Sequence, residues 1–575
     1  MHQTNKTIKK KINDFIIRSF IRKLYIWGNI LRMPALNWIG KDKIINHHQD
    51  VPYKVLNHEY GFFANGKTKT HADSGNLIIN GDNLEALKSL LPKYEGKVNC
   101  IYIDPPYNTG NESWVYNDNV NSSQMKKWLG KVVGKESEDL TRHDKWLCMM
   151  YPRLKLLHKL LDSNGAIFIS IDENELYNLQ IIMDEIFGKG NFVGQYNWFK
   201  SATPPNLSYK IKKNLEYILC YTKKSNSDKF TGIKKESASD DPFTKPQNSY
   251  KDLCFPKGSI NIKLENQTIV KGTYGTIKFP NELLDDLIIK NGFNENEIRF
   301  RNRFIWVQDK LDEELLNKTK ININSKSLVL SYKKENYNNE VPPNLIDEQV
   351  DVETTENAGR ELLKIFGEKV FDYPKPHSLI EYLINFLCDK NSIILDSFAG
   401  SGTTAHAVLN LNKQDGGNRK FILIEMEDYA ETITAERVKR VINGYADKEP
   451  TGGSFDYYTL GEPLFDENNN LNETVSIEKI REYVWFTETR SSYSPPLEGC
   501  PQDGVAFLGI YNDTSYYFIY EKDNLTTLDY DSLAHYVQQK AERYIIYAAN
   551  CLLPESFMRE KNIEFKKIPR DITRF

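Results

Sequence analysis

The clearest chemistry in the sequence lies at Asp104-Pro105-Pro106-Tyr107, directly after the apolar run Ile101–Ile103. Such a run predicts a buried strand, and open α/β sheets bind ligands beyond the carboxyl ends of their strands. The Asp104 carboxylate and the Pro105 carbonyl could accept hydrogen bonds from an amine whose lone pair is delocalised into an aromatic ring. An acceptor at this place would let the nitrogen become tetrahedral and attack an electrophilic methyl group.

The two prolines and the tyrosine of this motif would position the reacting groups. Pro105 and Pro106 fix φ, so ordering the loop costs little conformational entropy. Tyr107 offers a flat face on which an extruded nucleic-acid base could stack. The motif needs no metal for this work. The structural alternative is a Pro-Pro turn that simply ends a strand.

A second motif, Asp396–Thr404, follows the apolar run Ile393–Leu395 and opens a predicted helix. Gly400 and Gly402 would let the backbone turn tightly and approach a ligand closely. The next predicted strand ends on Glu425, whose carboxylate could bind both hydroxyls of a ribose, as in dinucleotide folds. This order of strand, Gly-x-Gly, helix, strand and acid predicts a nucleoside-binding site. A purely structural strand–helix turn is the alternative.

Two widespread nucleotide-binding loops fit the second motif poorly. A P-loop needs lysine directly after its last glycine, and Thr403 stands there. The dinucleotide fingerprint needs a third glycine three residues after Gly402, and that position is Ala405. Both interpretations are therefore disfavoured.

The elements that must position these motifs alternate between strands and helices on both sides of a long polar segment. This alternation is typical of βαβ units and a parallel sheet. We therefore predict an α/β fold: a Rossmann-like, mostly parallel, doubly wound sheet with an inserted segment and a C-terminal α+β module. The predicted parts are a basic N-terminal extension (1–32), two parts of the α/β domain (33–224 and 357–450), the insertion (225–356) and the C-terminal module (451–575).

The composition of the whole chain excludes several classes of protein. With 575 residues, 40% of them hydrophobic, the chain should form more than one domain. It has no apolar run long enough for a transmembrane helix, so no membrane is expected. The seven scattered cysteines and ten histidines show neither a disulfide framework nor metal-ligand spacing, so we expect a cytoplasmic protein without a metal. The basic, amphipathic first 32 residues could contact DNA or a membrane surface, or need not fold.

Taken together, Asp104-Pro105-Pro106-Tyr107 and Phe398–Gly402 resemble the catalytic and cofactor motifs of amino methyltransferases that act on DNA. The catalytic motif precedes the glycine motif, an order similar to that of the β class. The chain most resembles the modification subunit of type III restriction–modification systems and similar adenine-specific enzymes. Three further segments resemble this family: Pro34–Lys41, Asn80–Leu87 and Phe371–Pro376.

The resemblance implies a site-specific transfer of a methyl group from S-adenosylmethionine to the N6 amine of adenine in double-stranded DNA. The catalytic residues would be Asp104, Pro105, Pro106 and Tyr107. It implies Asp82 near the adenine of the cofactor and Lys375 in the segment that lines its methionine end. The remaining cofactor-binding residues would be Asp396, Phe398, Gly400, Gly402, Thr403 and Glu425. A restriction subunit with helicase and nuclease activity and a second copy of the chain are candidate partners.

In this family the region that corresponds to the insertion recognises the target sequence. The predicted strand Ile298–Val307 carries three alternating arginines, which would share one face. Arginine pairs well with guanine edges and phosphates, and upstream lysines suit contacts to the DNA backbone. The structural alternative is an edge strand guarded by charge. The DNA-binding candidates are Arg299, Arg301, Arg303, Lys212 and Lys213.

Three other functions stay open at this point. Methylation of a protein or small-molecule amine would use the same acid-Pro-Pro-Tyr logic but would not need a large lysine-rich insertion. Methylation of the exocyclic amine of cytosine would also fit, although that reaction in the family more often has serine in place of Asp104. A DNA-binding specificity subunit without activity is disfavoured by the intact catalytic motif.

Overall fold

The computed structural model describes residues 36–64, 66–109, 130, 141–203, 210–225, 228–232, 240–335, 340–494, 506–522 and 524–573. The predicted basic extension, 1–32, lies outside these residues. The chain divides into two compact units, one formed by Met1–Asp228 with Pro343–Phe575 and the other by Lys229–Pro342. Among the helices in the described ranges, none has the length and apolar character needed to cross a membrane.

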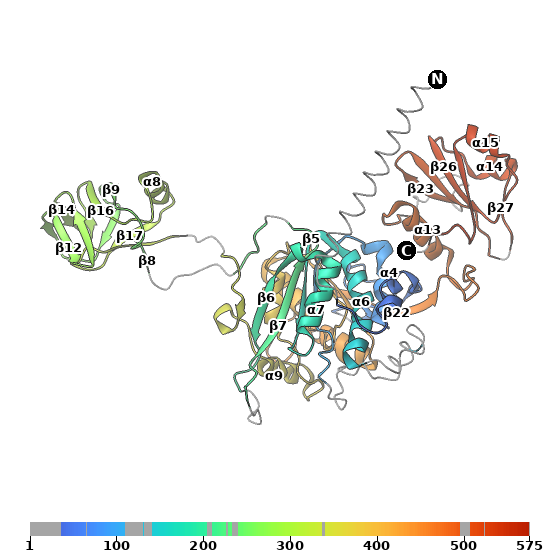
Figure 1. Cartoon of the computed structure of the whole chain (residues 1–575), viewed down its shortest axis with the longest axis horizontal. Coiled ribbons are helices and arrows are strands. Elements are labelled where there is room, and N and C mark those ends of the chain that lie inside the picture. Colours follow the sequence, from blue (N-terminus) through green and yellow to red (C-terminus); the bar gives the residue numbers. More distant parts are fainter. Residues whose placement is uncertain are drawn as a thin grey trace, which may run out of the picture. The chain divides into compact units, whose positions relative to one another are not determined.

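The first unit is built on one eleven-stranded sheet, whose middle strands appear in the centre of Figure 1. From β5 to β22 every pair of neighbouring strands is parallel, whereas β6, β7, β1 and β2 add antiparallel pairs at the two sides. The predicted mostly parallel, Rossmann-like sheet is confirmed. In spatial order the strands are β19 (Leu345–Ile346), β6 (Phe192–Phe199), β7 (Leu215–Thr222), β5 (Leu161–Ile171), β4 (Val98–Ile103), β20 (Ile393–Asp396), β21 (Lys420–Glu425), β3 (Leu77–Asn80), β22 (Ser454–Pro463), β1 (Lys54–Phe63) and β2 (Gly66–Thr68).

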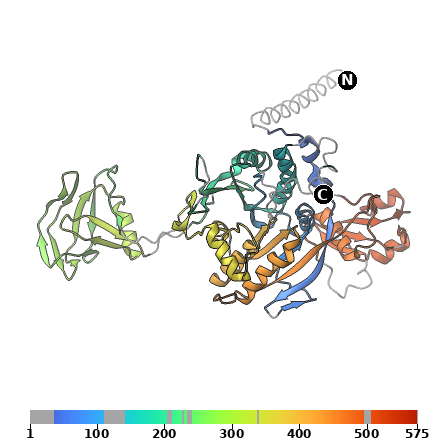
Figure 2. The same ribbon diagram turned by 90° about the horizontal axis from the view of Figure 1, so that it is seen from below.

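Helices cover both faces of this sheet (Figures 1 and 2). One face carries α4 (Asn83–Tyr94), α6 (Arg142–Leu160) and α7 (Leu176–Met183), and the other carries α9 (Thr355–Phe366), α10 (His377–Ile384), α11 (Thr403–Asp415) and α12 (Glu436–Asn443). The short helices α2 (Lys41–Ile44) and α3 (His47–Asp50) pack against α6. Single turns complete the unit at η2 (Asp184–Gly188), η3 (Lys189–Asn191), η4 (Glu348–Val350), η5 (Asp428–Ala430) and η6 (Glu431–Ala435).

Local sequence explains where two of these helices begin. Asp82 caps α4, because its Oδ1 accepts the amide hydrogens of Leu84 (2.8 Å) and Glu85 (3.4 Å). Thr141 and Asp144 form a capping box at the start of α6. Both helices then present apolar faces to one hydrophobic core, which they share with the strands of the sheet.

The inserted unit forms two sheets and one helix around its own hydrophobic core (green in Figure 1). The larger sheet contains β11 (Gln267–Ile269), β14 (Leu287–Lys290), β15 (Phe293–Asn294), β10 (Ile260–Ile262), β17 (Lys320–Ile323), β18 (Leu330–Lys333) and β8 (Asp241–Pro242). The smaller sheet contains β12 (Gly272–Thr276), β13 (Phe279–Leu283), β16 (Ile298–Asn302) and β9 (Lys251–Phe255), and the helix is α8 (Gln308–Leu316).

The boundaries of this unit differ from the predicted insertion, 225–356. Residues 343–356 return to the first unit, because β19 pairs in parallel with β6 and the Glu353 carbonyl accepts a hydrogen bond from Trp198 Nε1 at 3.1 Å. These pairings join segments that are far apart in sequence, so no local pattern predicts them. The polar composition of the inserted segment, in contrast, continues up to these residues.

The C-terminal module also begins later than the predicted residue 451. The strand β22 lies in the main sheet, parallel to β3 and antiparallel to β1. After it come α13 (Ile477–Thr489), a sheet of β23 (Phe507–Tyr511), β24 (Thr514–Phe518), β26 (Arg543–Ala548) and β28 (Ile563–Lys567), the pair β25 (Thr527–Leu528) and β27 (Asn550–Cys551), and the helices α14 (Tyr530–Tyr536) and α15 (Glu555–Glu560). Because α13 packs against α4 and shares its core, this module is continuous with the first unit.

Candidate active site

The predicted motifs meet at one edge of the main sheet, where four parallel strands end side by side. In β20, Leu395 pairs with Ile101 of β4 and Ile422 of β21. The last residue of β21, Glu425, pairs with Asn80 at the end of β3. This register brings the residues that follow β4, β20, β21 and β3 to the carboxyl edge, where open α/β sheets bind ligands.

Asp104 is held by two side chains on its two oxygens. Lys375 Nζ lies 2.7 Å from Oδ2, and the Tyr107 hydroxyl donates to Oδ1 at 2.8 Å. Burial raises the pKa of Asp104 above its ordinary value, and the positive charge of Lys375 opposes this rise. The carboxylate is therefore a stronger hydrogen-bond acceptor than an exposed aspartate, and it is fixed in orientation.

Glu216, in β7, is a second buried carboxylate at this place that sequence reasoning did not identify as a site residue. It accepts from the Tyr107 hydroxyl at 3.1 Å and lies 3.4 Å from Lys375 and 2.8 Å from Lys200. Burial alone would raise the pKa of Glu216, but the two lysines lower it below its ordinary value. The only available signal was one acid in an otherwise apolar strand.

The ammonium of Lys375 lies between the two carboxylates. Burial would lower the pKa of this lysine, but Asp104 and Glu216 raise it above the ordinary value, so the ammonium stays charged. It also lies 5.2 Å from the centre of the Tyr107 ring and 5.9 Å from that of Trp198. The predicted cofactor residue Lys375 is thus an immediate neighbour of the predicted catalytic residue Asp104.

The loop after β4 is held by hydrogen bonds to residues of α6 and to Glu175. Trp146 Nε1 donates to the Pro106 carbonyl at 2.7 Å. Asn108, which has a positive φ of 57°, donates to the Arg142 carbonyl at 3.2 Å and to the buried Glu175 carboxylate. Burial of both proline rings adds to this support. The predicted loop is therefore held by specific bonds as well as by proline stiffness.

The glycine loop has the backbone that its two glycines were expected to allow. Gly400 and Gly402 have φ values of 51° and 80°, and a Cβ on Gly402 would lie 2.9 Å from the Thr434 carbonyl oxygen. The Gly400 amide donates to Glu425 Oε2 at 2.7 Å. The other oxygen of Glu425 accepts from the amides of Met426 and Glu427 at 2.9 and 3.1 Å. Glu425 thus shapes the loop itself.

Two acids of the site have raised pKa values. Asp396 accepts from the Phe398 amide at 3.0 Å and the Thr404 hydroxyl at 2.6 Å. Burial raises the pKa of Asp396 to about 7, although these hydrogen bonds favour the ionised form. Burial also raises the pKa of Glu425 to about 7. Both carboxylates would gain from a ligand that brings positive charge or hydroxyl donors.

Two hollows open at this edge and share Asp104 and Phe398. The other residues that line the first are Tyr102, Phe371, Tyr373, Pro374, Lys375, Asp396, Ala399, Ser401, Thr403 and Thr404. The second is completed by Asn83, Pro106, Ser397, Glu425, Met426 and Tyr429. A bipartite ligand that occupied both hollows would have its middle against Asp104.

At two positions around these hollows the structure differs from the sequence-based expectation. Asp82 caps α4, and its neighbour Asn83 lines the second hollow in its place. Arg437, in α12, was not predicted: it is buried and donates to the hydroxyls of Ser401 (2.9 Å) and Thr403 (2.7 Å) from behind the glycine loop. No pattern in the sequence marks this arginine.

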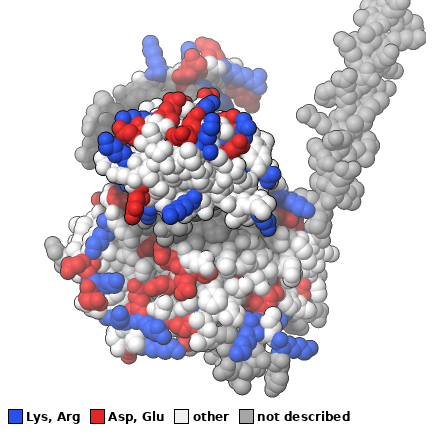
Figure 3. Space-filling model, turned by 90° about the vertical axis from the view of Figure 1, so that its left-hand side faces the viewer, with Lys and Arg blue, Asp and Glu red and all other residues white. Residues whose placement is uncertain are grey.

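The predicted DNA-binding arginines are engaged within their own unit. Arg299 forms a two-point ion pair with Asp285 at 2.8 and 2.7 Å, and Arg301 forms one with Asp252 at 2.6 and 2.8 Å. Arg303 lies just after the end of β16 at Asn302, where it donates to the Pro246 carbonyl and lies 5.0 Å from the centre of the Tyr250 ring. Basic and acidic side chains are intermixed on the face that Figure 3 shows.

The two predicted lysines lie in the first unit, just before β7. Both belong to an exposed segment, and Lys213 forms an ion pair with Glu173. The structure therefore brings the catalytic and cofactor candidates together at one edge. Three of the five DNA-binding candidates lie in the inserted unit and two in the first unit.

Comparisons with known proteins agree with this geometry. The DNA methylase family matches residues 98–436, which is more than half of the chain. The Mod subunit of the type III restriction–modification enzyme StyLTI from Salmonella typhimurium is 33% identical over 76% of this chain and 68% of its own length. The EcoPI Mod subunit from Escherichia phage P1 is 33% identical over 68% and 64%.

Among solved structures, a putative DNA modification methylase from Thermus thermophilus, complexed with S-adenosyl-L-methionine, matches 66% of this chain and 99% of its own, with 14% identity and a TM-score of 0.29. The chain spans about two thirds of the length of the curated Mod subunits that it matches. On the strength of the family match and the Mod relatives, the chain belongs to the DNA methylase family.

Proposed function

We propose that this chain transfers a methyl group from S-adenosylmethionine to the N6 amine of adenine in double-stranded DNA, as the modification component of a restriction–modification system. The observation that carries the proposal is the position of Asp104, a largely buried acceptor that lines two adjoining hollows. A methyl donor in the hollows and an amine at Asp104 would meet at this point.

The residues of the two hollows fit such a donor. The second hollow offers Glu425 for ribose hydroxyls and the Phe398 and Tyr429 rings for a flat base. Ser397 Oγ is buried there without a hydrogen-bond partner among the described residues, which suits a polar ligand. The first hollow offers Asp396 and the hydroxyls of Ser401 and Thr403 to an amino-acid end. When bound, S-adenosylmethionine supplies a methyl group made electrophilic by its sulfonium.

The residues of this chain then act on the amine. Asp104 accepts a hydrogen bond from the exocyclic N–H, so that the nitrogen lone pair turns away from the ring and toward the donor. Lys375 and Glu216 hold the carboxylate and the Tyr107 hydroxyl in place, which limits the reorganisation needed on reaction. After transfer the amine has one proton too many, and Asp104 is the nearest base to take it.

Target recognition is proposed for the inserted unit, Lys229–Pro342. The Arg299 and Arg301 side chains remain about half exposed (56% and 46%) in spite of their ion pairs, so they can exchange an acidic partner for DNA. Lys212 and Lys213 are proposed to contact the DNA backbone. We further propose that the chain acts in the cytoplasm. Its proposed partners are a restriction subunit and a second copy of the chain.

The test is the identity of the methylated nucleoside. The purified chain is incubated with duplex DNA and S-adenosylmethionine that carries a labelled methyl group, and the DNA is digested and analysed by mass spectrometry. We expect label in N6-methyladenine. Label in N4-methylcytosine would refute the adenine assignment. Label in added protein but not in DNA would refute the DNA substrate, and no label in any acceptor would indicate an inactive specificity subunit.

A further inference from the structure

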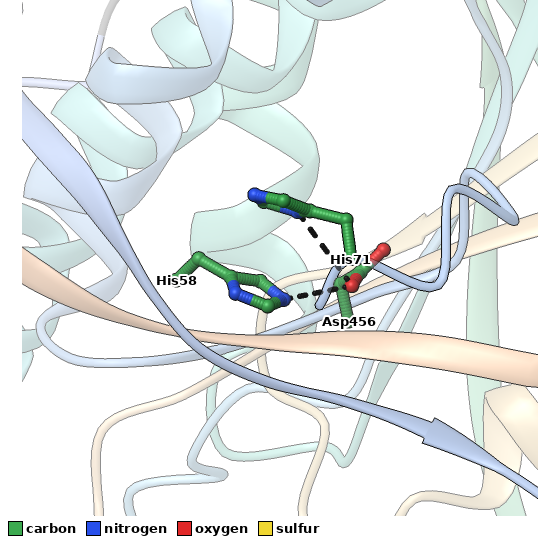
Figure 4. Close-up of side chains that lie close together, drawn as sticks. All are labelled: His58, His71 and Asp456. Carbon is green, nitrogen blue, oxygen red and sulfur yellow. Dashed lines mark hydrogen bonds and ion pairs between the residues drawn. The ribbon is translucent and has the colours of Figure 1, made fainter. Parts of the chain in front are cut away.

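Two histidines and an aspartate that are far apart in sequence converge beside β22, outside the hollows described above (Figure 4). His58 lies in β1, Asp456 in β22, and His71 in the segment between β2 and β3. His58 Nε2 is 2.8 Å and His71 Nδ1 is 3.7 Å from the same oxygen, Asp456 Oδ1. The two imidazole rings are stacked with their centres 3.7 Å apart.

The three side chains are held in place by their surroundings. The Ala72 and Asp73 amides donate to Asp456 at 2.7 and 3.2 Å, which fastens the segment that carries His71 to β22. This segment passes directly over β1 at Gly61, where a Cβ would lie 2.5 Å from the Thr70 carbonyl oxygen. A carboxylate fixed by amide hydrogen bonds and two imidazoles turned toward it are what a preorganised metal site needs.

The charge of Asp456 is not balanced by a lysine or arginine. This aspartate is 3% exposed, and among the described residues only the two histidines lie within ion-pair distance of it. A buried carboxylate is normally paired with a cation or coordinates a metal. A single cation shared by all three groups would balance the charge of this carboxylate.

We propose that His58, His71 and Asp456 bind one divalent transition-metal ion, with zinc as the representative of the class. Imidazole and carboxylate ligands suit such ions, and three protein ligands leave a position for water. Their donor atoms all lie within 4.8 Å of one another. Bond lengths of about 2 Å require separations of about 3.3 Å in a tetrahedral site, which small side-chain rotations can reach.

The ion would fasten the β1–β2 hairpin and the following segment to β22. Its function would be structural, because the site joins three parts of the chain next to β3 and takes no part in the methyl-transfer chemistry. The proposal stands independently of the proposed methyltransferase function.

A second group of possible ligands, Glu361, His377 and His406, serves as an internal comparison. Here Arg437 already supplies a buried positive charge: it donates to His406 Nδ1 at 3.2 Å and lies 3.9 Å from Glu361. His377 is bound by Glu361 at 3.2 Å and by Glu381 at 2.9 Å. The charge of this group is balanced without an ion, because Arg437 lies beside Glu361. We therefore assign the metal to His58, His71 and Asp456 alone.

The test uses the full chain, without an affinity tag, after treatment with a chelator. Zinc sulfate is titrated by calorimetry, and cobalt(II) is added separately to record its visible absorption bands. We expect one zinc per chain, a rise of the thermal unfolding temperature on binding, and cobalt bands typical of nitrogen and oxygen ligands. His71→Ala is the main variant, because this half-exposed side chain can be removed with little damage to the core.

We expect His71→Ala and Asp456→Asn to weaken zinc binding at least tenfold and to abolish the rise in unfolding temperature. The exposed His535→Ala is the matched control and should bind zinc as the parent does. His406→Ala should also leave zinc binding unchanged. Equal zinc affinity in His71→Ala and the parent, loss of zinc in His406→Ala, or no zinc uptake by the parent would each overturn the proposal.

Discussion

The carboxyl edge of the main sheet and the inserted unit differ in how they hold their charges. At the edge, Lys375 is buried between Asp104 and Glu216, and each group has more than one partner. In the inserted unit, Arg299 and Arg301 are exposed, and each has an acidic partner on its own small sheet or next to it. Buried groups with several partners cannot move cheaply, whereas exposed pairs exchange partners at little cost.

This difference suits an enzyme whose reaction stays the same while the DNA sequence that it recognises can change. It predicts that changes at the edge alter the chemistry for every DNA sequence, and that changes in the inserted unit alter which sequence is used.

Exchange of Lys229–Pro342 for the corresponding unit of a related methylase should have the largest effect, a complete change of the methylated sequence. The unit has its own core, so it can be replaced as a whole. Sequencing of methylated bases in DNA from cells that express each protein measures the result. If the exchanged enzyme kept the sequence of the parent, recognition would have to lie elsewhere, and the C-terminal module would be the next candidate.

Gly402→Val should weaken binding of S-adenosylmethionine by about 30- to 100-fold, the equivalent of about 2–3 kcal/mol. The new side chain would meet the Thr434 carbonyl oxygen at 2.9 Å, and φ at this position is 80°. Gly359→Val, in a place with open space, is the control and should bind the cofactor normally. Calorimetry with both variants provides the measurement. Normal binding by Gly402→Val would show that the glycine loop does not hold the cofactor.

Affinity for S-adenosylmethionine should rise between pH 6 and pH 8, by at most about tenfold for each of two carboxylates. Burial raises the pKa of Asp396 and Glu425 to about 7, so both are largely protonated and neutral at pH 6 and ionised at pH 8. A cofactor that carries positive charge and hydroxyl donors binds the ionised forms better, so its binding releases protons. Asp396→Asn should make the dependence of cofactor affinity on pH less steep. An unchanged dependence in that variant would show that Asp396 does not contribute to it.

Lys213→Ala should have the smallest effect, a loss of DNA affinity of about two- to fivefold that is the same for all sequences. One phosphate contact fewer should also reduce the slope of log affinity against log salt concentration by about one. Binding titrations at several salt concentrations, with the exposed Lys561→Ala as control, measure both quantities. A change of sequence preference in Lys213→Ala would show that this lysine reads bases.

The sequence predicted the parts of the fold and site that depend on local pattern. The parallel sheet and the strand ends at Asp104, Asp396 and Glu425 follow from apolar runs and the residues directly after them. The family was expected from the resemblance of the two motifs, and the match over 98–436 confirms it. The antiparallel strands β6 and β7 were not expected, because they break the βαβ alternation. Glu216 was therefore missed as a member of the site.

Contacts between distant segments left no signal in the sequence. Arg437 reaches the glycine loop from another helix, and β22 joins the main sheet although its composition resembles the C-terminal module. Asp456 lies 398 residues after His58, so no local ligand spacing could predict the convergence of His58, His71 and Asp456. The predicted strand Ile298–Val307 was too long, because β16 ends at Asn302.

The most direct test of the central claim measures methyl transfer and cofactor binding in the same variant, Asp104→Ala. Single-turnover transfer to duplex DNA should fall by at least about a thousandfold, because the amine loses its acceptor. Cofactor affinity should stay within about threefold of the parent, since Glu216 still pairs with Lys375. Asp531→Ala, an exposed aspartate of α14, is the control and should change neither quantity. Substantial transfer by Asp104→Ala, or a loss of cofactor binding as large as the loss of transfer, would contradict the role assigned to Asp104.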